Sequence, residues 1–127
     1  MKAVDLPAIR LKRIYDPPEG ADGFRILVDR LWPRGMKKEK AAIDCWAREL
    51  APSSALRKEF HRTRDYDRFR RQYLQELEDP EKEELWCRIR DRAAGRPITL
   101  LYASRDRTHN HAVVLKEWME AQAAVKK

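Results

Sequence analysis

Three short apolar stretches of the chain have the pattern of strands in a buried sheet. Residues 98–103, ITLLYA, form a run of β-branched, aliphatic and aromatic residues, which is typical of a strand covered on both faces. Residues 24–31 predict a second strand, and residues 9–15 partly alternate apolar with basic positions, as a strand near a sheet edge does. The two prolines and two glycines of residues 16–23 predict a loop between these two strands.

Apolar positions three or four residues apart predict the main helices. One such stripe follows the capping residue Asp65, and another lies between a second cap, Asp79, and Gly95. The last helix is expected over about residues 109–123. These stripes place one apolar face of each helix against the sheet.

Shorter segments lie between the second strand and the main helices. Residues 36–42 predict a helical turn, and Ser53 or Ser54 can cap a short helix that ends near residue 60. Residues 43–50 fit both a helical stripe and the alternation of a strand. The pattern therefore leaves both structures open for that segment.

The order of these elements predicts an α/β fold. Strands, then helices, then a further strand and helix are typical of a small, mainly parallel sheet flanked by helices. The 127 residues are enough for one compact domain with its own core. We place this domain at residues 9–123, between an N-terminal tail of residues 1–8 and a C-terminal tail of residues 124–127.

Composition and charge narrow the class of protein. Hydrophobic residues make up 43% of the chain, as in a packed globule, whereas 39% charged residues indicate very polar helix faces. No apolar run approaches the length of a membrane span, and the N-terminus lacks the apolar region of a signal peptide. We therefore expect a cytoplasmic protein without a membrane partner. The net charge of +7 suits anionic partners.

Cysteine and histidine spacing gives little support for a metal site or a cofactor. Cys45 and Cys87 lie far apart without a C-x-x-C pattern, so both are expected to be buried, inert thiols. His109 and His111 are two residues apart, which on a helix directs their side chains to nearly opposite sides. No further cluster supplies ligands, so neither a metal nor another cofactor is expected.

Polar residues gather where two of the predicted strands end. In a parallel sheet, the carboxyl ends of strands that face a helix N-terminus are the usual place for a ligand. Arginine side chains suit an anion, and a nearby glycine allows close approach to the backbone. The predicted ligand-binding residues are Arg30, Arg34, Gly35, Arg57, Ser104, Arg105 and Asn110.

The same corner contains residues that could act in catalysis. His109 or His111 could be an acid or base, since imidazoles titrate near neutral pH, and Asp106 could orient the ring. A structural interpretation also stays open, in which Asn110 caps the helix and His111 belongs to the core. We expect binding of an anionic small molecule, with its chemical transformation left open.

The charge also allows a nucleic-acid or protein interaction module. Arginines between residues 62 and 71 are interleaved with aromatic residues, as in some nucleic-acid binding surfaces. These aromatics occupy the apolar stripe of a predicted helix, however, and acidic residues follow directly. The interaction module is therefore the second hypothesis.

Three separated motifs resemble the YeaO-like family, a group of small bacterial domains of unknown function. They are VDRLWPRG from residue 28, LAPS from residue 50 with Leu56-Arg57, and LLYASRD from residue 100 with HNHA from residue 109. The resemblance covers about residues 9–119, implies a compact α/β fold and favours a strand within residues 43–50. It implies no activity. Longer relatives carry a cysteine at the strand end where this chain has Tyr102-Ala103-Ser104, so thiol chemistry is not expected there.

Overall fold

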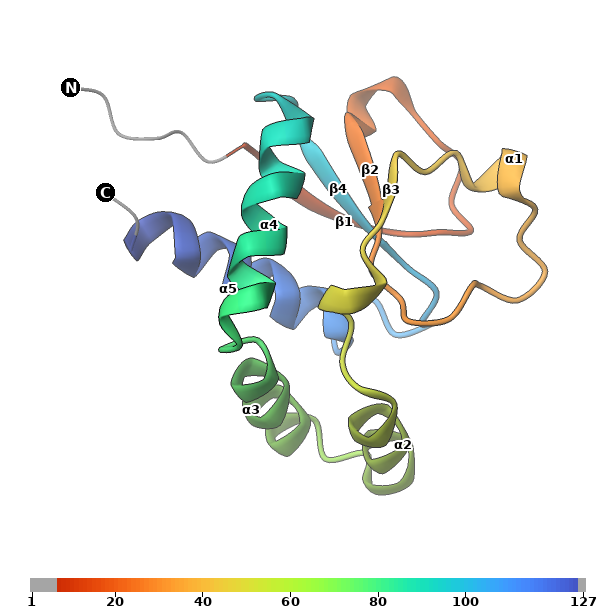
Figure 1. The fold of residues 1–127 in the computed structure, drawn as a ribbon. Helices are drawn as coiled ribbons and strands as arrows, with labels where there is room; N and C mark the ends of the chain where they lie inside the picture. Colours follow the sequence, from red (N-terminus) through yellow and green to blue (C-terminus); the bar gives the residue numbers. More distant parts are fainter. Residues whose placement is uncertain (1–6, 126–127) are drawn as a thin grey trace.

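A four-stranded parallel sheet forms the centre of the molecule. The computed structural model describes residues 7–125, so residues 1–6 of the predicted N-terminal tail (1–8) and residues 126–127 of the predicted C-terminal tail (124–127) lie outside the described part. The strands are β1 (Ile9–Arg13), β2 (Phe24–Leu27), β3 (Cys45–Trp46) and β4 (Ile98–Tyr102). Their order is β1-β4-β2-β3, and every neighbouring pair is parallel (Figure 1). The carboxyl ends of β2 and β4 are therefore neighbours.

The three predicted strands are confirmed, and each is shorter than predicted. β1 lies at a sheet edge as expected, and β2 ends at Leu27 rather than near residue 31. The open segment 43–50 contains the two-residue strand β3 followed by a 3₁₀ turn, η2 (Arg48–Leu50). A second 3₁₀ turn, η1 (Gly20–Asp22), lies within the predicted loop.

The predicted caps begin the main helices. The helices are α1 (Lys38–Ala41), α2 (Ser54–Thr63), α3 (Tyr66–Glu76), α4 (Pro80–Ala93) and α5 (His111–Val125). Ser53, Asp65 and Asp79 each accept a hydrogen bond from a backbone N–H in the first turn of α2, α3 and α4. α5 begins two residues later than predicted because Asn110 Oδ1 accepts the Val113 N–H at 3.0 Å and thereby caps it.

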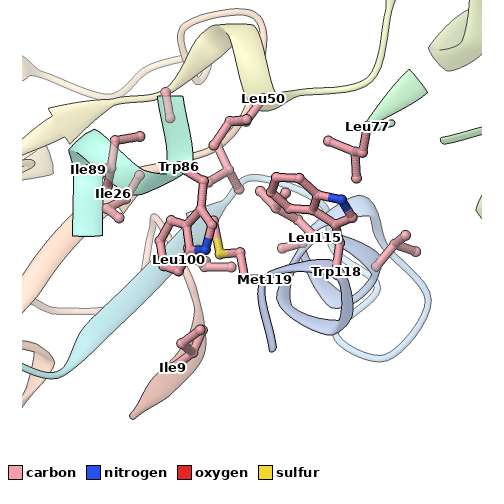
Figure 2. Close-up of a cluster of buried hydrophobic side chains, with 14 of the residues drawn as sticks. Ile9, Ile26, Leu50, Leu77, Trp86, Ile89, Leu100, Leu115, Trp118 and Met119 are labelled. Carbon is pink, nitrogen blue, oxygen red and sulfur yellow. The ribbon is translucent and has the colours of Figure 1, made fainter. Parts of the chain in front are cut away.

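The main hydrophobic core lies on one face of the sheet. Ile26 and Leu100 are paired in register and point to this face, where α4 supplies Trp86 and α5 supplies Leu115. All four side chains are fully buried. Figure 2 shows Trp86 among the aliphatic side chains of the strands, with Trp118 beside Leu115. Alternation along each strand therefore directs one set of residues toward the helices.

The opposite face of the sheet is covered by α1 and the loop that leads to it. Leu27 and Leu101, the next register pair, form a second cluster there with Ala41 of α1. Trp32 and Trp46 meet edge to face in the same cluster, with ring centroids 5.4 Å apart. Both faces of β2 and β4 are therefore buried, as expected for central strands of a parallel sheet.

A buried charged network closes one end of this second face. Asp22 accepts hydrogen bonds from Lys12 at 3.0 Å and from Arg25 at 2.5 Å. Burial alone would raise the pKa of Asp22, but hydrogen bonds from the Glu19 backbone N–H, Lys12 and Arg25 outweigh it and leave the pKa lowered. The network joins η1 to β1 and β2.

No helix within residues 7–125 is both long and apolar enough to cross a membrane.

We predict that Asp22→Asn lowers the free energy of unfolding at pH 7 by about 1–3 kcal/mol, because two cations lose their charged acceptor. The pKa of Asp22 is lower in the folded protein than in the unfolded chain, where it is about 3.9. Ionised Asp22 therefore stabilises the fold above about pH 3.9, and this stabilisation is lost as the pH falls through the folded-state pKa. Urea unfolding from pH 7 to pH 2.5 should therefore show the variant and the wild type converging in acid. The exposed Asp91→Asn is the control, and equal stability of Asp22→Asn and wild type at pH 7 would contradict the prediction.

Candidate functional site

A cavity of about 680 Å³ lies where β2 and β4 end. Its walls come from the segments that follow these two strands, from the first turn of α5, and from α2 and α3. Figure 1 shows α2 and α3 beyond the end of the sheet, so that α2 faces the strand ends across this space. The residues that line it are Asp29, Arg30, Leu31, Pro52, Arg57, Lys58, Phe60, His61, Arg64, Phe69, Ser104, Asp106, His109 and His111.

The cavity brings together most of the predicted site residues. The chain has three histidines, and all of them, His61, His109 and His111, line this space. The other predicted residues that line it are Arg30, Arg57, Ser104 and Asp106. The cavity therefore lies at the expected position, the carboxyl ends of the strands.

Asp29 connects the walls of the cavity. Its Oδ2 accepts the Ala103 N–H at 3.0 Å, and its backbone carbonyl accepts the Trp46 indole N–H at 2.7 Å. Its Oδ1 lies 2.8 Å from His111 Nε2, and both side chains are less than one-fifth exposed, at 14% and 17%. Neither of these two atoms has a hydrogen-bond partner elsewhere in residues 7–125. Asp29 is thus the carboxylate that faces His111.

Asp106 has a different role from the one predicted for it. Its Oδ1 accepts the backbone N–H groups of His109 at 2.9 Å and Thr108 at 3.0 Å, which lower the pKa of this exposed carboxyl. It lies 3.9 Å from His109 Nδ1. Asp106 therefore stabilises the turn before α5 and lies near His109. Asp29 is the carboxylate beside His111.

Arg30 is partly used for structure. Its Nε donates to the Pro52 carbonyl at 3.0 Å and its Nη2 to the Ala51 carbonyl at 3.2 Å. These bonds hold the turn between η2 and α2 against the end of β2. The guanidinium therefore positions α2 as well as contributing charge to the cavity.

The cations of α2 have no such partners. Arg57 and Lys58 are exposed, line the cavity and form no ion pair with any carboxylate in the described part of the chain. His61 lies one turn after Arg57, and Arg64, at the αL cap of α2, donates from Nε to the His61 carbonyl at 3.1 Å. This side of the cavity is consequently positive.

Aromatic side chains fix the α2–α3 hairpin beside the site. Phe60 stacks on Phe69, with ring centroids 4.6 Å apart and an interplanar angle of 25°. The Tyr66 hydroxyl donates to the Asn110 carbonyl at 3.1 Å, and the Tyr66 ring meets His109 edge to face. The hairpin is thus joined to the start of α5.

Four predicted ligand-binding residues do not line the cavity. The Trp32 indole donates to the Met36 carbonyl at 2.7 Å and packs in the second cluster, on the sheet face that α1 covers. The turn that contains Arg34 and Gly35 therefore lies away from the cavity. Arg105 is exposed and is not among the residues that line the cavity. Asn110 is buried and serves as the α5 cap, which matches the structural alternative. The placement of these residues in the pocket is therefore corrected.

Sequence reasoning missed several lining residues. Asp29 lies two residues after the end of β2, so the expectation of ligand-binding residues at strand ends, which led to Arg30, applied to Asp29 too. The four-residue spacing from Arg57 to His61 places both on one side of a helix and was a usable signal. Leu31, which is 58% exposed, gave no signal because its exposure depends on the tertiary structure.

Thiol and metal groups are not prominent at this site. Cys45 and Cys87 are free and half-buried, neither lines the cavity, and burial raises the pKa of the Cys45 thiol. Within residues 7–125, no group of three or more His, Cys, Asp or Glu side chains is placed to hold a metal ion.

Comparison with known proteins gives consistent family matches. A family model described as "Inactive DUF488-N3 subclade" matches residues 8–127. The uncharacterized protein YeaO of Escherichia coli (strain K12) is 52% identical over 114 residues, covering 89% of this chain and 97% of the relative. The uncharacterized protein Rv3073c of Mycobacterium tuberculosis (strain ATCC 25618 / H37Rv) is 31% identical over 115 residues, covering 90% and 95%. No solved structure matches the chain significantly.

We predict that Asp29→Ala destabilises the fold by about 1–3 kcal/mol in urea unfolding, because the Ala103 N–H loses its acceptor and His111 loses its facing carboxylate. Asp106→Ala is the comparison. It removes a carboxylate from an exposed turn, and water can replace the lost acceptor there. A larger loss for Asp106→Ala than for Asp29→Ala would contradict the assigned roles.

Proposed function

Because the chain belongs to the inactive DUF488-N3 subclade, we propose that it binds an anionic small molecule and does not transform it. The description of the subclade supports binding over catalysis. The nature of the lining groups supports it too, since neither cysteine of the chain reaches the cavity. Ser104 Oγ accepts the Asp106 N–H at 3.2 Å, a contact within the turn that follows β4.

The unpaired cations of α2 carry this proposal. Elsewhere on the surface, Arg68 forms an ion pair with Glu59. Arg57 and Lys58 instead face a hollow, and Arg64 adds a third positive charge to the same wall. A phosphate or carboxylate group placed there would accept charge-assisted hydrogen bonds from them.

The cavity is also suited to a small molecule in size and composition. Ligand sites are typically hollows of about 300–1,000 Å³ with apolar walls and a few polar groups. At about 680 Å³, with Pro52, Phe60 and Phe69 among its lining residues, this cavity has that character. The cytoplasmic location expected from the sequence stays a prediction.

We predict that inorganic phosphate binds at this cavity and that Arg57→Ala weakens the binding about tenfold, because a hydrogen bond to a charged group is lost. Backbone amide shifts in ¹H–¹⁵N spectra during a phosphate titration measure both the affinity and the place of binding. Arg34→Ala is the matched control, since it removes the same charge from an exposed position outside the cavity. Shifts at residues outside the cavity, or equal losses in both variants, would refute the proposal.

Nucleic-acid binding is the second candidate, favoured by the net charge of +7 and by exposed arginines around the α2–α3 turn, such as Arg62 and Arg71. The aromatics that alternate with them in the sequence, Phe69 and Tyr73, are buried and cannot stack on bases. Any such binding would therefore depend mainly on phosphate contacts.

For this candidate, affinity for a single-stranded or duplex oligonucleotide should fall steeply and linearly on logarithmic axes as salt rises, through counterion release. Fluorescence anisotropy between 50 and 300 mM salt, with a labelled 20-nucleotide probe, measures that slope (about 0.7–0.9 per phosphate contact). Absence of binding at the lowest salt would exclude the candidate.

A further inference from the structure

A row of basic side chains follows α2 along the cavity. Arg57, His61 and Arg64 are spaced four and three residues apart, which places them on one side of the helix, and all three line the cavity. The seven positions from Arg57 to Arg64 correspond to about 10 Å along the axis, at about 1.5 Å per residue. Lys58 lines the same space beside Arg57. The positive charge is therefore spread along the helix and not gathered at one point.

Arg30 extends this row beyond the start of α2. It comes from the segment after β2, and it donates to the carbonyls of Ala51 and Pro52, directly before the cap residue Ser53. A guanidinium has five N–H donors, so these two bonds leave further donors on a side chain that lines the cavity. The row thus begins with Arg30 at one end of α2 and finishes with Arg64 at the other.

The carboxylates that line the cavity do not neutralise this row. Asp29 Oδ1 is closed to solvent and lies 2.8 Å from His111 Nε2, while Asp106 Oδ1 accepts backbone N–H groups of its own turn. Within residues 7–125, neither carboxylate forms an ion pair with a cation of the row. One phosphate group carries about two negative charges at pH 7. A single group therefore leaves part of the row, which has four cations, without a counter-charge.

From this row we infer that the ligand carries at least two phosphate groups in a chain, as a diphosphate or a longer polyphosphate does. One group lies at Arg57 and Lys58, and the next lies along α2 toward Arg64. Each added group accepts further charge-assisted hydrogen bonds from these cations. This inference rests on the proposed function, because it names the class of anion that the same cavity binds.

Inorganic phosphate, pyrophosphate and tripolyphosphate test the number of phosphate groups. The full chain is titrated calorimetrically with each probe at pH 7, without divalent cations and at one ionic strength, because salt screens exposed charges. We expect pyrophosphate to bind about tenfold more tightly than phosphate, since the second group gains hydrogen bonds to charged donors. Tripolyphosphate should bind at least as tightly as pyrophosphate.

Arg64→Gln and Arg62→Gln form a matched pair of variants. Both remove a positive charge from an exposed side chain at the end of α2, but only Arg64 lines the cavity. Arg64→Gln should weaken tripolyphosphate about tenfold, and by a larger factor than it weakens phosphate, whereas Arg62→Gln should change neither affinity. Lys58→Gln is a second variant at an exposed position, and it should weaken both probes.

The chain of phosphates can be a free polyphosphate or part of a nucleotide. Adenosine 5′-triphosphate distinguishes these sources from tripolyphosphate, because only the nucleotide has a base that could cover the apolar side chains Leu31 and Phe60 in the cavity lining. Tighter binding of the nucleotide would assign that source, and equal binding would assign the free chain. Both results support the inference.

The outcomes distinguish this inference from the function on which it rests. Equal affinities for phosphate, pyrophosphate and tripolyphosphate, all lowered by Arg57→Ala, would overturn the inference and leave anion binding intact. Equal losses in Arg64→Gln and Arg62→Gln would overturn it too, because binding would then follow the general positive charge. Failure of every probe, inorganic phosphate included, would overturn both. Binding of an oligonucleotide without binding of tripolyphosphate would overturn the inference in favour of the interaction module.

Discussion

The contacts of Asp29 hold together the side of the cavity that lies at the strand ends. Residue 29 follows β2, yet its side chain and carbonyl bind the Ala103 N–H after β4 and the Trp46 indole of β3, and its Oδ1 faces His111 in α5. Because parallel strands are not joined by a tight turn, these contacts of Asp29 are cross-links between segments that are far apart in the chain. The strand-end wall of the cavity depends on this one side chain.

The opposite wall is fixed in another way. The segment before α2 is held by the Tyr73 hydroxyl on the Leu50 carbonyl at 2.5 Å, by Arg30 on the Ala51 and Pro52 carbonyls, and by Glu76 on Ser53. Burial raises the pKa of Tyr73 well above its usual range, so this phenol remains a neutral donor. Because these contacts involve backbone groups and a cap, the cations of α2 are not needed to hold the helix in place. They remain available for a ligand.

Membership in a subclade described as inactive fits a site of this construction. The cavity keeps cations, histidines and a buried acid at the position where α/β sheets bind ligands, while both cysteines lie elsewhere. Its relatives over nearly the same length are uncharacterized, so the chemistry of the cavity is the main guide to function.

The sequence by itself determined the local elements and the edge of the sheet at which the site lies. Ser53, Asp65 and Asp79 cap helices by contacts within one turn, and β4 (Ile98–Tyr102) is a run of mostly apolar residues, so these features were readable from neighbouring residues. Only the tertiary structure decided which side chains meet. Arg34 follows the same strand as Arg30 but is carried to the other face by the packing of Trp32, and Asp29 faces His111, which lies 82 positions further along the chain. Contacts of that kind depend on how strands are ordered in the sheet, which no local pattern encodes.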